Sequence, residues 1–394
     1  MKLLMYMPTP GGLTGAPRRM LTLARELQSL GVAVCVASDA GSEVLKAARQ
    51  QGIESVELDP VGGLKTRGAD VFRRGGLFRV WLLVLLMLQN LRVFRVARKV
   101  GADVVWLRGS KGVLFAGAGC LLARRPVVWD VDYELPSVGL VRRLHRFGLW
   151  LASAVVFQYR RAPEAIFGSD LAIRYQRKFS SIIPGIELSR LPTGMRVHSG
   201  GQSLSGKPAV ILQVGTVCDR KNQCFTADVL AKVRELAPTL NFEWLIAGGL
   251  GDETYVQKAR GRVSEHGLTP VTRFLGWRDD VVALMSAADL LIMPSRDEGV
   301  PNTVQEAMYM GIPVLVSDAG GMAEVVDHEV TGWVRSLDSP EDWASDVVSC
   351  FGDAAQAESM RLRASRYASH NFGTEAWGKR YLSVLRAVLS RAVR

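Results

Sequence analysis

Two glutamates with seven residues between them, Glu298 and Glu306, are the residues of this sequence whose spacing says most about chemistry. They lie in residues 294–321, which read PSRDEGVPNTVQEAMYMGIPVLVSDAGG. Carboxylates can accept hydrogen bonds from the hydroxyl groups of a sugar or a ribose. The pattern predicts a sugar near Glu298 and a ribose near Glu306, with a diphosphate held between them.

The diphosphate has an expected binding place at the start of a helix. Pro301 fits the first helical position, where its fixed φ is suitable and its missing N–H costs nothing. The N–H groups of Asn302, Thr303 and Val304 would then point toward the preceding loop, and such a helix start favours phosphate.

The whole string resembles a known donor site. Glu-x7-Glu, followed by Ala-Met, Gly-x-Pro-Val and Gly-Gly, is similar to the donor site of retaining GT-B glycosyltransferases of family 4. The resemblance implies that Glu298 contacts the donor sugar and that Glu306 binds the ribose. Close donor contacts would come from the residues between them, Gly299, Val300, Pro301, Asn302, Thr303 and Val304. The alternative is a Rossmann-type helix with two incidental carboxylates.

A second motif carries positive charge. Val214-Gly215-Thr216, followed by Arg220-Lys221-Asn222, resembles the phosphate clamp of the same family, with Thr216 in the position that often holds Arg. Cations beside a diphosphate offset the charge of the leaving group as the glycosidic bond breaks. Arg220 and Lys221 are therefore predicted catalytic residues and Thr216 a donor contact. A basic turn before a helix is the alternative.

A glycine near the N-terminus belongs to the same expected site. The segment Thr14-Gly15-Ala16-Pro17-Arg18 is similar to the family's Gly-Gly-x-x-Arg loop, with Thr14 in place of the first Gly. Gly15 would let the backbone approach the donor diphosphate closely. A plain turn is the alternative.

The motif Asp130-Val131-Asp132 permits two interpretations. Asp-x-Asp is the metal signature of the GT-A fold, which would need Mg²⁺ or Mn²⁺ held by carboxylates and substrate phosphate. In the GT-B family that this chain resembles, this strand end often carries an active-site His, which Asp132 would replace. We take Asp132 as a candidate catalytic residue, Asp130 as a weaker one, and expect no metal.

Length and pattern predict two α/β domains. A chain of 394 residues is too long for one ordinary core. Alternating strands and helices imply parallel sheets in both halves. We expect an N-terminal acceptor-side domain over residues 1–186, a linker over 187–208 and a donor-binding domain over 209–373. The resemblance implies a GT-B fold, two doubly wound Rossmann-like domains facing across a cleft, with a final helix (374–394) that packs back on the first domain.

The net charge of +11 comes from one segment. Residues 65–150 hold sixteen basic and five acidic residues, whereas acids and bases balance in the rest. The same segment contains the apolar run VWLLVLLML at 80–88, which at nine residues is too short to cross a bilayer. Apolar helices flanked by Arg suit the surface of an anionic membrane. A core helix with solvated Arg residues is the alternative, and nucleic acid is disfavoured because no binding motif is present.

These observations predict a retaining glycosyltransferase of the hexosyltransferase type. It would move a sugar from a UDP or GDP sugar to a saccharide or lipid-linked acceptor, in surface polysaccharide assembly, without a cofactor. The five scattered cysteines indicate a reducing compartment, so we expect a cytoplasmic protein, peripheral on the inner face of the membrane. The alternatives are a nucleotide-sugar epimerase of the same fold and a non-catalytic sugar-nucleotide-binding subunit.

Overall fold

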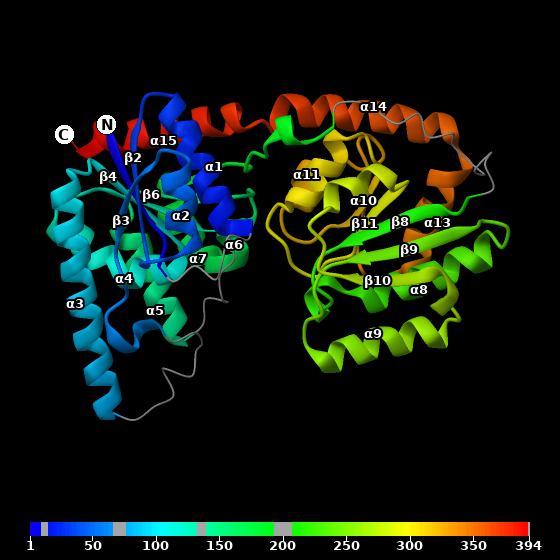
Figure 1. Ribbon diagram of the computed structural model, residues 1–394, viewed down its shortest axis with the longest axis horizontal. Helices are drawn as coiled ribbons and strands as arrows, with labels where there is room; N and C mark the ends of the chain where they lie inside the picture. The colour runs from blue at the N-terminus through cyan, green and yellow to red at the C-terminus, as the bar shows by residue number, and fades with distance from the viewer. Residues whose placement is uncertain (9–14, 66–75, 132–138, 193–206, 393–394) are drawn as a thin grey trace. The chain divides into compact units, whose positions relative to one another are not determined.

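The computed structural model consists of two compact units (Figure 1). It describes residues 1–8, 15–65, 76–131, 139–192 and 207–392. The first unit comprises Met1–Gly185 and Thr374–Arg394, and the second comprises Ile186–Gly373. The last segment of the chain therefore belongs to the same unit as its beginning, and most of the expected linker 187–208 lies outside the described residues.

The first unit is built on a seven-stranded parallel sheet of order β3-β2-β1-β4-β5-β6-β7. The central strands are short apolar runs with buried side chains, as expected for strands covered on both faces. Their bounds are β1 Lys2–Tyr6, β2 Ala33–Ser38, β3 Glu54–Glu57, β4 Val104–Arg108, β5 Val127–Val131, β6 Ala154–Phe157 and β7 Phe179–Ser181.

Helices cover both faces of this sheet. Helices α1 (Gly15–Ser29), α2 (Glu43–Gln50) and α15 (Thr374–Ala392) pack on one face, where Met20, Leu27 and Tyr381 share one core. The opposite face carries α3 (Gly76–Val100), α4 (Gly109–Leu122), α5 (Gly139–Leu151), α6 (Ala162–Phe167) and α7 (Ser169–Tyr175).

The second unit repeats the plan with a six-stranded parallel sheet of order β10-β9-β8-β11-β12-β13. Its strands are β8 Ala209–Val214, β9 Phe242–Ala247, β10 Thr272–Gly276, β11 Leu290–Met293, β12 Val314–Ser317 and β13 Trp333–Arg335. Figure 1 shows α8 and α9 on one side of the sheet and α10, α11 and α14 on the other. The helices are α8 Gln223–Leu236, α9 Glu253–Glu265, α10 Val281–Ala287, α11 Asn302–Tyr309, α12 Met322–Val325, α13 Pro340–Gly352 and α14 Ala354–Asn371.

The predicted α/β architecture with parallel sheets in both halves is confirmed. Two local features differ from expectation. Gly15 begins helix α1 rather than lying in a loop before it. The polar edge strand β3 was not foreseen, since its residues ESVE lack an apolar run.

Helix α3 is longer than its apolar run. Judged by length and composition alone, Val80–Val100 is long and apolar enough to cross a membrane. The expectation from the nine-residue run 80–88 underestimated the length of the apolar helix. Its inner side chains, among them Leu82, Leu85 and Val93, are buried in the core of the first unit. In this fold α3 is therefore a layer helix of the sheet.

Candidate functional site

Three loops of the second unit meet at one edge of its sheet. Strands β8, β11 and β12 are neighbours and parallel, so their carboxyl ends lie side by side. The order of the sheet reverses between β8 and β11, and ligands of open α/β sheets bind beyond the strand ends at such a point. The predicted residues from Gly215 to Lys221 and from Glu298 to Pro301 lie in two of these loops.

The centre of the site is one carboxylate between two cations. The Lys221 Nζ lies 2.6 Å from the Glu298 Oε1, and the Arg220 Nη1 lies 2.5 Å from the same oxygen. The Lys221 and Glu298 side chains are only 11% and 12% exposed, whereas that of Arg220 is 45% exposed. The structure thus joins three residues that the sequence places 77 and 78 positions apart, and Arg220 also donates to the Asp297 carbonyl at 3.2 Å.

The backbone of Lys221 is held by hydrogen bonds from residues that no sequence motif identified. The buried Gln213 side chain donates to the Lys221 carbonyl at 2.8 Å, and Thr226 donates to Gln213 in turn. Gly215 has φ +142°, and a Cβ there would lie 2.6 Å from the Lys221 Cε. The absence of a side chain at Gly215 therefore gives Lys221 the room to reach Glu298.

The Glu298 loop is fixed by a close backbone contact. Gly320 has φ +61°, and a Cβ on it would lie 1.6 Å from the Glu298 carbonyl oxygen. Its neighbour Gly321 donates its N–H to the Gly299 carbonyl at 3.0 Å. Only glycine permits this approach, so the Gly-Gly pair positions Glu298 through its backbone.

Arg296 connects the two charged loops. Its N–H donates to the Arg220 carbonyl at 2.8 Å, and its Nη2 donates to the Asn222 Oδ1 at 3.1 Å. Asn222 has the left-handed φ of +56°, which turns the chain from the Asp219–Lys221 turn into α8. No sequence motif identified this function of Arg296, because both contacts join the loop after β11 to the loop after β8.

The environment of the site raises the pKa of one carboxyl group. Burial, followed by the nearby charge of Glu298, raises the pKa of Asp297, while Arg220 opposes this shift. Asp297 directly precedes Glu298 in the chain, and the repulsion between their two carboxylates contributes to this shift.

The predicted helix start is confirmed with a shift of one residue. Pro301 is the residue before α11, with φ −69° and ψ 130°, rather than its first helical residue. Its carbonyl accepts from the Gln305 N–H at 3.4 Å, which closes the first turn. Among the described residues, no carbonyl accepts from the N–H groups of Thr303 or Val304, as expected in the first turn of a helix.

The remaining donor residues of this unit lie along the same elements. Val300 and Val304 are buried, and Asn302, Thr303 and Glu306 are partly buried. Glu306 is the fifth residue of α11, one turn from its start. Thr216 is exposed at the end of β8, and its carbonyl accepts from the Gln223 side chain at 3.2 Å.

Two predicted residues belong to the first unit. Gly15 begins α1, and nothing lies within 4 Å of a Cβ built on it, so local packing does not require a glycine there. Asp132 falls in residues 132–138, outside the described residues. Both remain predictions.

Asp130 has structural partners. Its carboxylate accepts from the Arg108 Nη1 at 3.1 Å and from the Tyr381 hydroxyl, so it joins β4, β5 and the C-terminal helix α15. Burial and the charge of Asp130 raise the pKa of Tyr381 well above its usual value. Across the described part of the chain, no group of three or more His, Cys, Asp and Glu residues is arranged to hold a metal. We interpret Asp130 as an anchor of α15.

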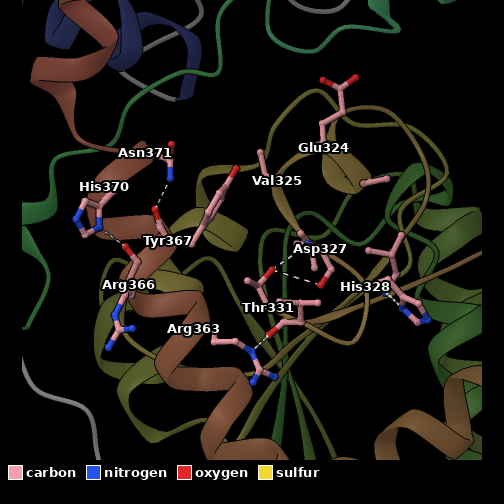
Figure 2. Close-up of a pocket in the computed structure, with 14 residues that line it drawn as sticks. Glu324, Val325, Asp327, His328, Thr331, Arg363, Arg366, Tyr367, His370 and Asn371 are labelled. Carbon is pink, nitrogen blue, oxygen red and sulfur yellow. Dashed lines mark hydrogen bonds between the residues drawn. The ribbon is translucent and has the colours of Figure 1, made fainter.

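A separate pocket of about 810 Å³ lies in the second unit (Figure 2). It is lined by α12, the loop after it and the last turns of α14, including Glu324, His328, Arg363 and His370. Arg363 donates to the Val330 carbonyl at 2.8 Å. None of the predicted site residues lines this pocket.

The two doubly wound parallel sheets have the architecture of the GT-B fold. The structure is similar to that of Anabaena HepE in complex with UDP, with a TM-score of 0.76, 20% identity, and coverage of 98% of this chain and 100% of the other. The family model for group 1 glycosyl transferases matches residues 208–353, which is less than half of the chain and lies within the second unit.

Curated relatives agree with this family. A D-inositol 3-phosphate glycosyltransferase of Jonesia denitrificans is 28% identical over 200 residues, which are 48% of this chain and 47% of that protein. A UDP-Gal:alpha-D-GlcNAc-diphosphoundecaprenol alpha-1,3-galactosyltransferase of Escherichia coli is 24% identical over 180 residues, 44% of this chain and 45% of that protein. The chain thus spans about half the length of these relatives.

Proposed function

We propose that this protein transfers a hexose from a nucleoside diphosphate sugar to a hydroxyl acceptor with retention at the anomeric carbon. The observation that carries the proposal is the contact of Lys221 and Arg220 with a single oxygen of Glu298, three residues before Pro301 and the start of α11. Cations and a helix start beside a sugar-binding carboxylate are the groups that an activated sugar needs.

The donor diphosphate takes the place of Glu298 as the partner of the two cations. Lys221 and Arg220 then bind phosphate oxygens, and the N–H groups at the start of α11 add partial positive charge. This arrangement stabilises the diphosphate as negative charge grows on it during bond cleavage. We propose that these groups stabilise the charge of the leaving diphosphate without a metal ion.

Glu298, released from the cations, orients hydroxyl groups of the sugar, and Glu306 binds the ribose. The leaving diphosphate departs from the face on which the acceptor enters, and one of its oxygens takes the acceptor proton. The new bond forms between the acceptor oxygen and the anomeric carbon while the bond to the diphosphate breaks. Retention follows because departure and attack occur on the same face.

The acceptor and the base are assigned by analogy. UDP is the proposed nucleotide because a structural neighbour binds UDP, with GDP the second candidate. A lipid-linked saccharide is the proposed acceptor, since one relative acts on a diphosphoundecaprenol-linked sugar. We propose a cytoplasmic protein, peripheral on the membrane and active in surface polysaccharide assembly.

Nucleotide titration followed by turnover tests the proposal. UDP should raise the melting temperature of the wild-type protein more than ADP does, and Lys221→Met should abolish most of this rise. Incubation with a UDP-sugar should release UDP only when an acceptor is supplied. Release of an epimerised sugar without acceptor would favour the epimerase, and binding without any turnover would favour the non-catalytic subunit. No response to UDP or GDP would contradict the proposal.

A further inference from the structure

Three helices of the first unit form one layer on one face of its sheet (Figure 1). Helix α4 lies between α3 and α5 and packs closely on both through glycines. A Cβ on Gly119 would lie 2.2 Å from the Asn90 carbonyl oxygen of α3, and one on Gly117 would lie 2.6 Å from the Leu151 Cδ2 of α5. These close contacts make the α3–α4–α5 layer a single structural element.

Polar contacts attach α3 to the rest of the unit. Gln89 donates to the Tyr6 hydroxyl of β1 and accepts from the Val61 N–H, both at 3.0 Å. Asn90 accepts from the Gly119 N–H and donates to the Leu114 carbonyl. If α3 crossed a bilayer alone, all four contacts, two of them buried, would be lost in a medium where unsatisfied polar groups cost most. The folded α3 therefore lies along the sheet.

The outer surface of this layer is unusually apolar. Of the seventeen large apolar side chains that are exposed among the described residues, eleven belong to α3, α4 and α5. Val80 is 61% exposed, Leu122 is 60% exposed and Trp150 is 57% exposed. We call the following set the apolar outer face: Val80, Trp81, Leu83, Val84, Met87, Leu88, Leu121, Leu122, Leu140, Phe147 and Trp150. A cluster of exposed apolar side chains on one layer is typical of a surface that binds another protein or a membrane.

The charges of the layer have one sign. The three helices contain nine Lys and Arg residues and no Asp or Glu. On α3 the exposed residues change from apolar between 80 and 88 to cationic at Arg92, Arg95, Arg98 and Lys99. Helix α5 adds exposed Arg143 and Arg146 between its exposed apolar residues. Apolar side chains with neighbouring cations are suited to a lipid bilayer, which has anionic headgroups over an apolar layer of acyl chains.

We propose that the apolar outer face of the α3–α4–α5 layer docks on an anionic lipid bilayer, with α3 lying in the interface rather than crossing it. Trp81, Met87 and Trp150 enter the boundary between headgroups and acyl chains, and the cations contact lipid phosphates. The inference rests on the proposed function in one respect: docking would bring a lipid-linked acceptor to the site. Docking itself can be measured without sugar transfer.

Flotation with vesicles tests the docking. The wild-type protein should float with phosphatidylcholine vesicles that contain phosphatidylglycerol, more weakly in high salt, and far less with phosphatidylcholine alone. The variant Arg95→Gln/Lys99→Gln/Arg143→Gln should lose affinity on the order of 100-fold, since each cation near such a surface contributes about fivefold.

A matched control separates docking from net charge. The variant Arg177→Gln/Lys258→Gln/Arg391→Gln removes the same number of exposed charges outside the layer and should float as well as the wild type. A loss as large as that of the layer variant would overturn the proposal, and so would failure of the wild type to bind anionic vesicles in low salt.

A second variant tests the contribution of the apolar side chains to vesicle binding and the alternative that a second copy of the chain covers the apolar outer face. Met87→Ser/Trp150→Ser should abolish the binding that persists in high salt while leaving the melting temperature and the UDP response unchanged. If light scattering instead shows a dimer that this variant converts to a monomer, and vesicles do not bind, a second copy of the chain covers this face and the proposal is wrong. Vesicle binding without any nucleotide response would leave docking intact and remove the proposed function.

Discussion

Replacement of Glu298 by Gln should change nucleotide binding and sugar transfer in opposite directions. Glu298 contacts both Lys221 and Arg220, the two cations that are proposed to bind the diphosphate. At an effective dielectric constant of about 20, charges separated like those of Lys221 and Glu298 attract by about 6 kcal/mol before any solvation is considered. The exposed guanidinium of Arg220 adds about 0–1 kcal/mol, because solvent screens it.

Rehydration of the separated charges returns most of this attraction. We expect a net cost of about 1–2 kcal/mol for opening the pair, which corresponds to roughly a 5- to 30-fold change in an equilibrium constant. Glu298→Gln removes this cost, so the affinity for UDP should rise by that factor. Transfer should fall by about 100-fold or more, since a neutral amide accepts hydrogen bonds from the sugar hydroxyls more weakly than a carboxylate and no longer holds the sugar in the reactive orientation.

Isothermal titration with UDP and a UDP-release assay measure the two effects on the same protein preparation. Glu306→Gln serves as the control, because it removes a proposed ribose contact and leaves the cations paired with Glu298. It should weaken UDP binding. If Glu298→Gln weakens UDP binding as Glu306→Gln does, the competition between carboxylate and diphosphate does not exist and the reasoning fails.

Two further predictions concern stability. Gly320→Ala should lower the free energy of unfolding by about 3 kcal/mol or more, because Ala is strained at a positive φ and its Cβ would meet the Glu298 carbonyl. Gly261→Ala, in the open middle of α9, should raise it by about 0.5–1 kcal/mol, and equal effects of the two changes in urea unfolding would contradict this account. Tyr381→Phe should cost about 1.5–3 kcal/mol, because the buried Asp130 carboxylate loses a donor. A change below about 0.5 kcal/mol would show that Asp130 does not anchor α15.

Much of the fold was accessible from local patterns. The final helix begins at the predicted Thr374, because its apolar residues recur with one period after a clear break. Edge strands such as Glu54–Glu57 were missed, since they bury little and show no apolar run.

The supporting contacts of the site could not be predicted. Gln213 and Arg296 show no motif, and they matter only because β8 and β11 are neighbours in the sheet. Sheet order is a long-range property, and it decides which loops meet at the strand ends. The partner of Asp130, which is part of an Asp-x-Asp motif, was equally hidden, because it is a tyrosine of helix α15 that lies 251 residues away in the chain.

The sequence by itself determined which residues are candidates for chemistry in this chain. The spacing of Glu298 and Glu306, the neighbouring Arg220 and Lys221, and the concentration of cations between residues 65 and 150 are all properties of short segments. Tertiary structure alone decided that Lys221 and Arg220 share one oxygen of Glu298. It alone decided that α3, α4 and α5 turn their apolar side chains outward together. The physical reason is that residue type and period act within one element, whereas contacts between elements depend on how the sheets and layers are assembled.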